Sequence, residues 1–139
     1  MQELAVSEYI GIPFVDLGRD REGLDCWGLF RLVLQEQLGI ELPSFIEVYE
    51  GETSNWEHLG RAITGRIAQV GWEPVPAGQE QPGDGVLCRL RGEPMHVGVV
   101  VRPGIMIHTH RGTNACLEPY RRAQWRSRIL GFYRHRSMT

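Results

Sequence analysis

The sequence contains no lysine, so each of its 15 basic residues is an arginine. With 17 acidic residues the formal net charge is −2, which does not provide the basic surface that nucleic-acid binding requires. No stretch approaches the roughly 20 apolar residues of a membrane-spanning helix, and residues 1–14 lack the basic start and apolar run of a secretory signal. We therefore expect no nucleic-acid partner, no membrane insertion, and synthesis in the cytoplasm without a signal peptide.

Cysteine is scarce as well. The three thiols, Cys26, Cys88 and Cys116, are an odd number without a Cys-x-x-Cys pair, so they predict no closed disulfide framework. A reducing compartment, or a chain with one functional thiol, fits this usage better than a disulfide-stapled domain. The 42% hydrophobic and 23% charged content indicates an ordinary globular protein, and we expect one domain over residues 1–139. No cofactor is expected.

Two kinds of periodicity divide the chain. Apolar residues recur at helical spacing after Asp25, and a helix is expected from Cys26 to a C-cap at Gly39. Shorter helices are expected at 2–10, 55–67 and 119–126, and irregular segments at 15–23 and 43–54. From residue 71 onward, alternation and turn signals predict strands at 85–90, 95–101, 105–110, 115–118 and 129–134. Helices followed by an antiparallel sheet predict an α+β fold.

The first turn of the helix at Cys26 favours nucleophilic chemistry. Cysteine attacks as the thiolate, and an ordinary thiol pKa of about 8.5 leaves most of it protonated at neutral pH. A helix N-terminus lowers that pKa, and its N–H groups can receive the oxyanion of an attacked carbonyl. Gly28, two residues later, is expected to leave room for substrate beside the sulfur.

A base for this thiol is available at the start of the strand predicted at 95–101. His96 precedes the apolar run 97–101, where an imidazole needs a partner for its ring. Counting from the turn at 102–104, an antiparallel hairpin brings positions 96 and 108 nearly opposite each other. His108 can therefore fix the tautomer of His96, and His110 is expected on the same face as His108.

Several segments resemble a known family. Residues 12–14 (IPF) and 23–29 (GLDCWGL) are similar to the nucleophile motif of the NlpC family of papain-like cell-wall cysteine endopeptidases. Residues 81–85 (QPGDG), 96–99 (HVGV) and 107–108 (IH) resemble its base and third-residue strands. The resemblance covers about residues 8–120, in the same order, and implies N-terminal helices packed on an antiparallel β-sheet.

The resemblance also implies an activity, the hydrolysis of peptide bonds in peptidoglycan stem peptides. It makes Cys26 the nucleophile, His96 the general base and acid, and His108 the residue that orients His96. Substrate-binding residues carried over by position are Asp25, Trp27 and Phe14. Trp27 stands where many relatives have Ser, and Phe14 where many have Tyr, so the substrate pocket is expected to be reshaped.

The form Asp-Cys-Trp-Gly, followed by residues 29–33 (LFRLV), looks most like the branch of the family found in phage and prophage tails. This branch implies tail-tip proteins as partners and the virion tail as the location. Two alternatives stay open. One is a tail component that keeps the fold without activity, and the other is a metal site formed by His96, His108, His110 and Cys26.

Overall fold

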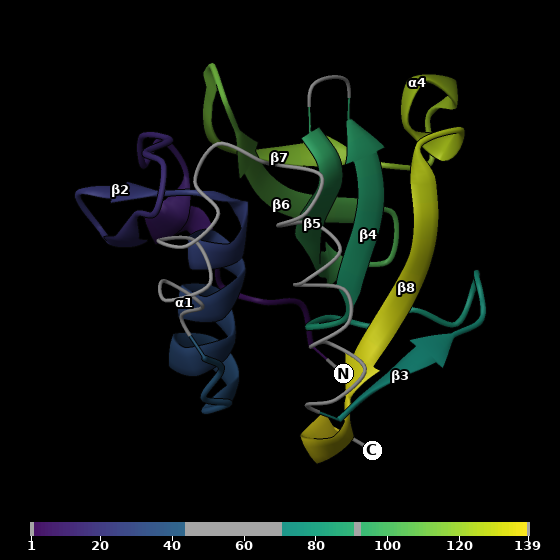
Figure 1. Ribbon diagram of the computed structural model, residues 1–139. Coiled ribbons are helices and arrows are strands. Elements are labelled where there is room, and N and C mark those ends of the chain that lie inside the picture. Colours follow the sequence, from purple (N-terminus) through teal and green to yellow (C-terminus); the bar gives the residue numbers. More distant parts are fainter. Residues whose placement is uncertain (1, 44–70, 91–92, 139) are drawn as a thin grey trace.

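A long helix packs on a six-stranded sheet in the computed structural model, which describes residues 2–43, 71–90 and 93–138 (Figure 1). The helix expected at 55–67, and nearly all of the irregular segment expected at 43–54, lie outside these residues. The helical elements are η1 (Ser7–Tyr9), α1 (Cys26–Leu38), α4 (Ala123–Arg126) and η2 (Arg136–Met138). Among the described helices, none is long and apolar enough to cross a membrane.

The strands form two sheets. A small one consists of β1 (Arg19–Asp20) and β2 (Gly23–Leu24), inside the segment expected to be a loop. The large one consists of β3 (Trp72–Val75), β4 (Gly85–Leu90), β5 (Glu93–Arg102), β6 (Ile105–His110), β7 (Thr113–Pro119) and β8 (Ile129–His135). Its order is β3-β8-β4-β5-β6-β7, and every neighbouring pair is antiparallel. The predicted α+β fold class is confirmed.

Local sequence explains both ends of α1. The Asp25 carboxylate accepts a hydrogen bond from the Gly28 N–H at 2.7 Å, as an N-cap does. At the other end Gly39 has a φ of 67°, a left-handed conformation in which glycine avoids the Cβ clash. Its N–H bonds to the Gln35 carbonyl at 3.1 Å. The predicted helix and both of its caps are confirmed.

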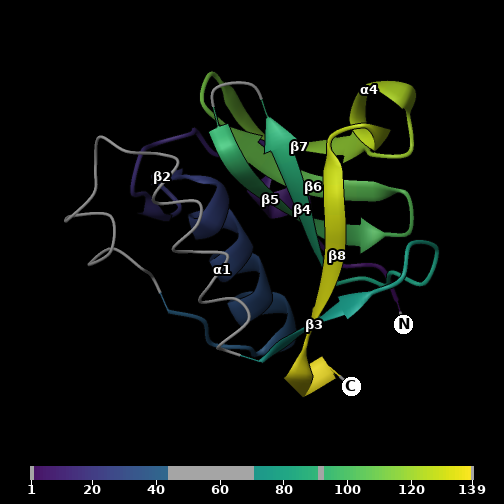
Figure 2. The same cartoon turned by 45° about the vertical axis from the view of Figure 1, so that its right-hand side comes forward.

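Side chains on the two faces of the large sheet enter two separate apolar clusters. Figure 2 shows α1 along one face, where it packs on β5 and β6. The cluster on this side includes Phe30, Val33, Val97, Val99 and Ile107. The cluster on the other side includes Val86, Val100, Met106, Trp125 and Phe132. Successive residues of a strand therefore contact different layers.

The N-terminal segment departs from its predicted structure. A helix is expected at 2–10, but only the single turn η1 is helical there. Leu4 and Val6 are both buried, and their separation of two positions is the period of an extended chain. The Leu4 N–H bonds to the Val101 carbonyl at 3.1 Å, so contact with the end of β5 overrides the helical pattern.

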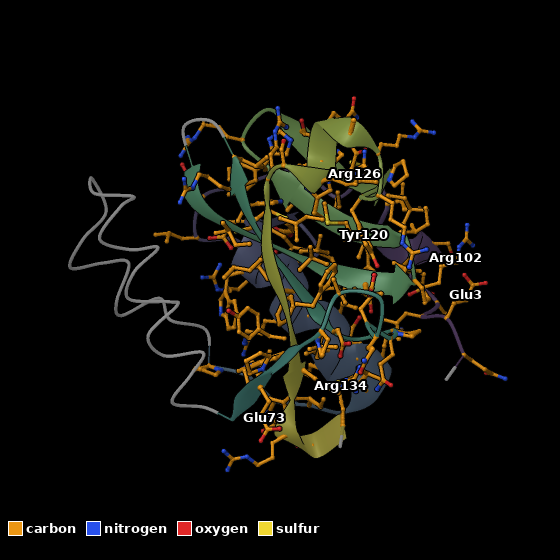
Figure 3. The ribbon with its side chains drawn as sticks, turned by 90° about the vertical axis from the view of Figure 1, so that its right-hand side faces the viewer. Glu3, Glu73, Arg102, Tyr120, Arg126 and Arg134 are labelled. Carbon is orange, nitrogen blue, oxygen red and sulfur yellow. The ribbon has the colours of Figure 1, made fainter. Side chains whose placement is uncertain are left out.

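Two ion pairs join strands of the large sheet to neighbouring segments of the chain. Arg102, at the end of β5, lies 3.2 Å from Glu3 (Figure 3). The Arg134 guanidinium on β8 contacts the fully buried carboxylate of Asp84 through two hydrogen bonds of 2.9 Å. Asp84 immediately precedes β4, so this pair joins the turn before β4 to β8.

Candidate active site

Cys26 is the first residue of α1, and its side chain is partly buried. Two N–H groups of this helix start are already engaged, because that of Gly28 bonds to the Asp25 carboxylate and that of Leu29 to the Asp25 carbonyl at 2.9 Å. The Cys26 N–H belongs to the positive end of the helix and lies next to the sulfur.

A loop crosses the first turn of α1 at very short range. A Cβ atom on Gly28 would lie 2.1 Å from the Gly18 carbonyl oxygen. A Cβ atom on Gly18 would in turn lie 2.2 Å from the Gly23 carbonyl oxygen. The expectation that Gly28 leaves space for substrate is wrong, because the Gly18 carbonyl occupies that space. The two glycines instead fix the helix start against the loop.

Asp25 is buried beside this loop. Arg19 Nη1 lies 2.6 Å from Asp25 Oδ1, and the Leu17 N–H donates to Oδ2 at 3.2 Å. Burial raises the pKa of Asp25, although the Arg19 charge and the hydrogen bonds oppose this shift. Asp25 is only 2% exposed, and its carboxylate caps α1 and binds Arg19; its expected contact with substrate stays a prediction.

Trp27 is also in the interior. Its side chain is fully buried and stacks on Phe30, with a ring-centroid distance of 5.4 Å. The indole N–H donates to the Pro43 carbonyl at 2.8 Å. A ring held in this way is not available to substrate in this conformation. Trp27 therefore packs in the core, and its expected contribution to the substrate pocket stays a prediction.

His96 and His108 form a buried pair on β5 and β6. His96 Nε2 lies 2.8 Å from His108 Nδ1, and each residue is 1% exposed. Since Val100 pairs with Met106, position 108 lies opposite position 98 and diagonal to position 96. The expected contact between the two rings is confirmed, through a diagonal pairing.

The environment of His108 keeps its ring neutral. Burial, together with the charges of the neighbouring His96 and His110 rings, lowers the pKa of His108 to about 3. A neutral imidazole carries one proton. If Nδ1 accepts a hydrogen bond from His96 Nε2–H, the single proton of His108 is on Nε2. His108 can therefore receive a hydrogen bond from a positively charged His96 while remaining uncharged itself.

Residues 11–16 connect the start of α1 to the strands that carry the histidines. This segment exchanges two hydrogen bonds with Ala115 of β7, at 2.8 and 2.9 Å, and two with Leu24 at 3.0 and 3.2 Å. Leu24 is two residues before Cys26, and β7 pairs with β6. Figure 1 shows that α1 and β5 start at the same end of the molecule. The thiol-bearing helix start and the histidine-bearing strands therefore share one support.

Phe14 lies within this connecting segment and is half-buried. The Arg111 guanidinium is 5.8 Å from the centre of its ring, a cation–π arrangement, and Arg111 also pairs with Asp16 at 2.9 Å. Of the three residues predicted to bind substrate, Phe14 is the one whose side chain reaches the surface.

The remaining thiols differ from each other. Cys88 is fully buried, as expected for a packing residue, and burial raises its pKa to about 12. Cys116 is half-buried, and burial together with Glu118 raises its pKa. No partner for Cys116 is expected from the sequence, yet it is the register partner of His108 across β6 and β7. The register shifts between His108 and His110, so counting from the turn at 111–112 would have put Ala115, and not Cys116, opposite His108.

The metal set expected as an alternative is not the one that the structure brings together. Within the described ranges, the group of possible ligands that converges consists of His108, Cys116 and Glu118, whose ligand atoms all lie within 4.8 Å of one another. His110 stays nearby, with its ring centre 5.4 Å from that of His108. The side-chain alternation of β7 puts residues 116 and 118 on the face of His108.

The fold is papain-like, and the chain belongs to the NlpC/P60 family, whose pattern it matches over residues 11–134. Among curated proteins it is similar to the gamma-DL-glutamyl hydrolase of Bacillus subtilis (strain 168), with 29% identity over 139 residues. That alignment covers 96% of this chain and 28% of the relative, so the chain spans little more than a quarter of the Bacillus protein.

Solved structures of the same fold come from several proteins. The NlpC/p60 domain of the peptidoglycan hydrolase SagA superposes with a TM-score of 0.58 at 22% identity, over 92% of this chain and 90% of that one. A lipoprotein-like NLP/P60 protein of Staphylococcus aureus reaches 0.65 at 19% identity, over 92% and 38%. An NlpC/P60 protein of Bacillus cereus reaches 0.65 at 20%, over 92% and 37%.

Proposed function

We propose that this chain is a cysteine endopeptidase that hydrolyses peptide bonds in the stem peptides of bacterial peptidoglycan. Cys26 is the nucleophile, His96 the general base and acid, and His108 the residue that orients His96. The observation that carries the proposal is the buried contact of 2.8 Å between His96 Nε2 and His108 Nδ1, at the end of the sheet where α1 starts. Such a pair has little packing value, because burying two imidazoles costs free energy that the apolar neighbours do not return.

The proposed reaction is acyl transfer. The Cys26 thiol gives its proton to His96, and the resulting thiolate attacks the peptide carbonyl carbon. The oxyanion is held by the Cys26 N–H at the positive end of α1. His96 then protonates the leaving amine, the C–N bond breaks, and a thioester remains. Water, deprotonated by His96, hydrolyses the thioester and restores the thiol.

The substrate is proposed from the relatives. The Bacillus relative is named for the hydrolysis of gamma-glutamyl bonds, and SagA is named a peptidoglycan hydrolase. A wall peptide contains a glutamyl linkage of this kind, so bonds next to glutamate are the first to test. Phe14 is proposed to contact the substrate with its ring, and it supplies no hydroxyl to the oxyanion or the amine.

Two experiments test this function. Mass spectrometry of purified muropeptides after incubation reports both the activity and the bond. Cys26→Ala should abolish cleavage without changing the circular dichroism spectrum, and His108→Ala should reduce the rate less than His96→Ala. If His108→Ala removed activity as completely as His96→Ala, the assigned roles would be wrong.

Iodoacetamide labelling against pH tests whether His96 acts on the thiol. Cys26 should react well below pH 8, and His96→Ala should move its profile toward the ordinary thiol pKa of about 8.5. Cys88→Ala is the matched control and should leave the Cys26 profile unchanged. An identical Cys26 profile with and without His96 would contradict the proposed pair.

We further propose that the protein is associated with a phage or prophage tail and that its partners are tail-tip proteins. The support is the similarity of residues 25–33 to that branch of the family. The competing function is a tail component that keeps the fold without catalysis, which the missing hydroxyl at Phe14 favours. Intact muropeptides together with an unshifted Cys26 labelling profile would decide for the second function.

A further inference from the structure

A second cluster of reactive side chains lies on the side of His108 that faces away from His96. His108 Nε2 is 3.8 Å from Glu118 Oε1, and the Cys116 sulfur completes a set whose ligand atoms lie within 4.8 Å of one another. Cys116 pairs directly with His108 across β6 and β7, and Glu118 follows two residues later on the same face. Three different functional groups, an imidazole, a thiol and a carboxylate, therefore converge from two strands.

His108 Nε2 supplies an independent indication that a ligand belongs here. The His108 side chain is fully buried, and within the described residues this nitrogen has no hydrogen-bond partner. The distance of 3.8 Å to Glu118 is too long for a hydrogen bond. A buried nitrogen without a partner costs about 1–3 kcal/mol, so it calls for an explanation.

We propose that His108, Cys116 and Glu118 form a binding site for a zinc ion. Imidazole nitrogen, thiolate sulfur and carboxylate oxygen are the three ligand types that zinc prefers, and their usual bonds of about 2.0–2.3 Å fit three atoms at this spacing after small side-chain movements. Cys116 is half-buried and the Glu118 side chain is 28% exposed, so an ion can enter from solvent. A water molecule would take the fourth position.

A metal at this site would act on the catalytic pair through the His108 ring, a consequence that rests on the proposed function. Zinc on Nε2 leaves the single imidazole proton on Nδ1, where it points at His96 Nε2. This proton faces the Nε2 proton that the imidazolium form of His96 carries, so the two N–H groups oppose each other and that form is disfavoured. Zinc binding should therefore inhibit hydrolysis without occupying the thiol of Cys26.

Zinc binding is measured first, independently of activity. Full-length chelator-treated Cys26→Ala protein, which lacks the proposed nucleophile thiol, is titrated with Zn²⁺ by calorimetry and with Co²⁺ by absorption. We expect one equivalent of each ion and a thiolate-to-cobalt absorption band. Losing an indirect partner of a metal ligand already costs about 10- to 100-fold in affinity. Adding Cys116→Ser should weaken binding at least as much and remove the band, whereas adding Cys88→Ala should leave both unchanged.

Hydrolysis is then measured in protein with Cys26 intact, with Zn²⁺ added at the concentration that saturates the site. Cys116→Ser should keep its metal-free rate and resist inhibition, and Glu118→Gln serves as a second variant with the same expected resistance. Absence of binding to the Cys26→Ala protein, or binding that survives Cys116→Ser, would overturn the site. Equal inhibition with and without Cys116 would overturn its action on the catalytic pair. Because the binding titration uses the Cys26→Ala variant and does not depend on activity, its result can be interpreted even if the proposed hydrolysis is not observed.

Discussion

Replacing Gly28 by Ala tests whether the start of α1 is fixed by the loop that crosses it. Two effects of this substitution have opposite signs. Alanine is a better helix former than glycine by about 1 kcal/mol, so helix propensity alone predicts stabilisation. The new Cβ atom, however, would lie 2.1 Å from the Gly18 carbonyl oxygen. Carbon and oxygen atoms that are not bonded normally approach no closer than about 3.3 Å, so this contact is more than about 1 Å too short.

The clash should outweigh the gain in propensity, because the loop has little freedom to retreat. A Cβ atom on Gly18 would itself lie 2.2 Å from Gly23, the Gly18 carbonyl accepts from Arg19 Nη1 at 2.7 Å, and the Gly18 N–H donates to Val15 at 2.9 Å. Overpacking costs about 1–3 kcal/mol, and a disturbed N-cap about 1 kcal/mol more. After subtraction of the propensity gain, we expect a net loss of about 2 kcal/mol.

Urea and thermal unfolding measure the loss of stability, and peptide hydrolysis measures the loss of activity. A loss of about 2 kcal/mol should lower the melting temperature by several degrees. Since a displacement of about 1 Å at reacting groups can cost about 100-fold in rate, hydrolysis should fall by far more than the loss of folded protein explains. Gln35→Ala, on an exposed position of the same helix, is the control and should change stability by less than about 0.5 kcal/mol. A Gly28→Ala protein as stable and active as the wild type would refute the reasoning.

Three further predictions concern other buried groups. The pKa of His108 is lowered to about 3, so its contribution to stability is complete above the unfolded pKa of about 6.5 and is lost as pH falls from there toward 3, by up to about 1.4 kcal/mol per pH unit. His108→Gln should flatten this acid dependence in urea titrations at pH 7, 6 and 5, and parallel curves would contradict it. Arg134→Met should cost about 3 kcal/mol in the same assay, because the fully buried Asp84 loses its cation, whereas Arg122→Met at an exposed position should be neutral. Cys88, with a pKa of about 12, should escape iodoacetamide at pH 8 until urea unfolds the protein, as mass spectrometry of tryptic peptides would reveal.

Sequence patterns predicted the elements whose signals are local. The helix from Cys26 to Leu38 has an N-cap and a left-handed C-cap next to its own ends, and β4 and β6 have the predicted bounds because turns flank them. The expected helix at 2–10 was wrong because the Leu4 N–H donates its hydrogen bond to the Val101 carbonyl on the distant strand β5. No local pattern predicted β3, whose partner β8 comes near the end of the chain.

The candidate site divides in the same way. The contact between His96 and His108 follows from counting residues around one hairpin, so the sequence was sufficient to predict it. The roles of Trp27 and Gly28 could not be read from spacing, because the groups that fill the space around them come from residues 18 and 43. Cys116 and Glu118 could not be placed beside His108 by counting, because the register of β6 and β7 shifts between His108 and His110.

The charges around His96 determine how strongly the proposed ion pair depends on the position of Cys26. A neutral His108 accepts a hydrogen bond from His96 but carries no negative charge, unlike the carboxylate found in many triads. In the proposed mechanism the His96 imidazolium must then draw its electrostatic support from the Cys26 thiolate, and the thiolate from the imidazolium and the positive end of α1. Stability of the ion pair therefore depends on how accurately the helix start is held. The loop whose Gly18 carbonyl lies where a Gly28 side chain would be holds this helix start in place. In the proposed mechanism Gly28 therefore affects the reaction rate, although it has no reactive group.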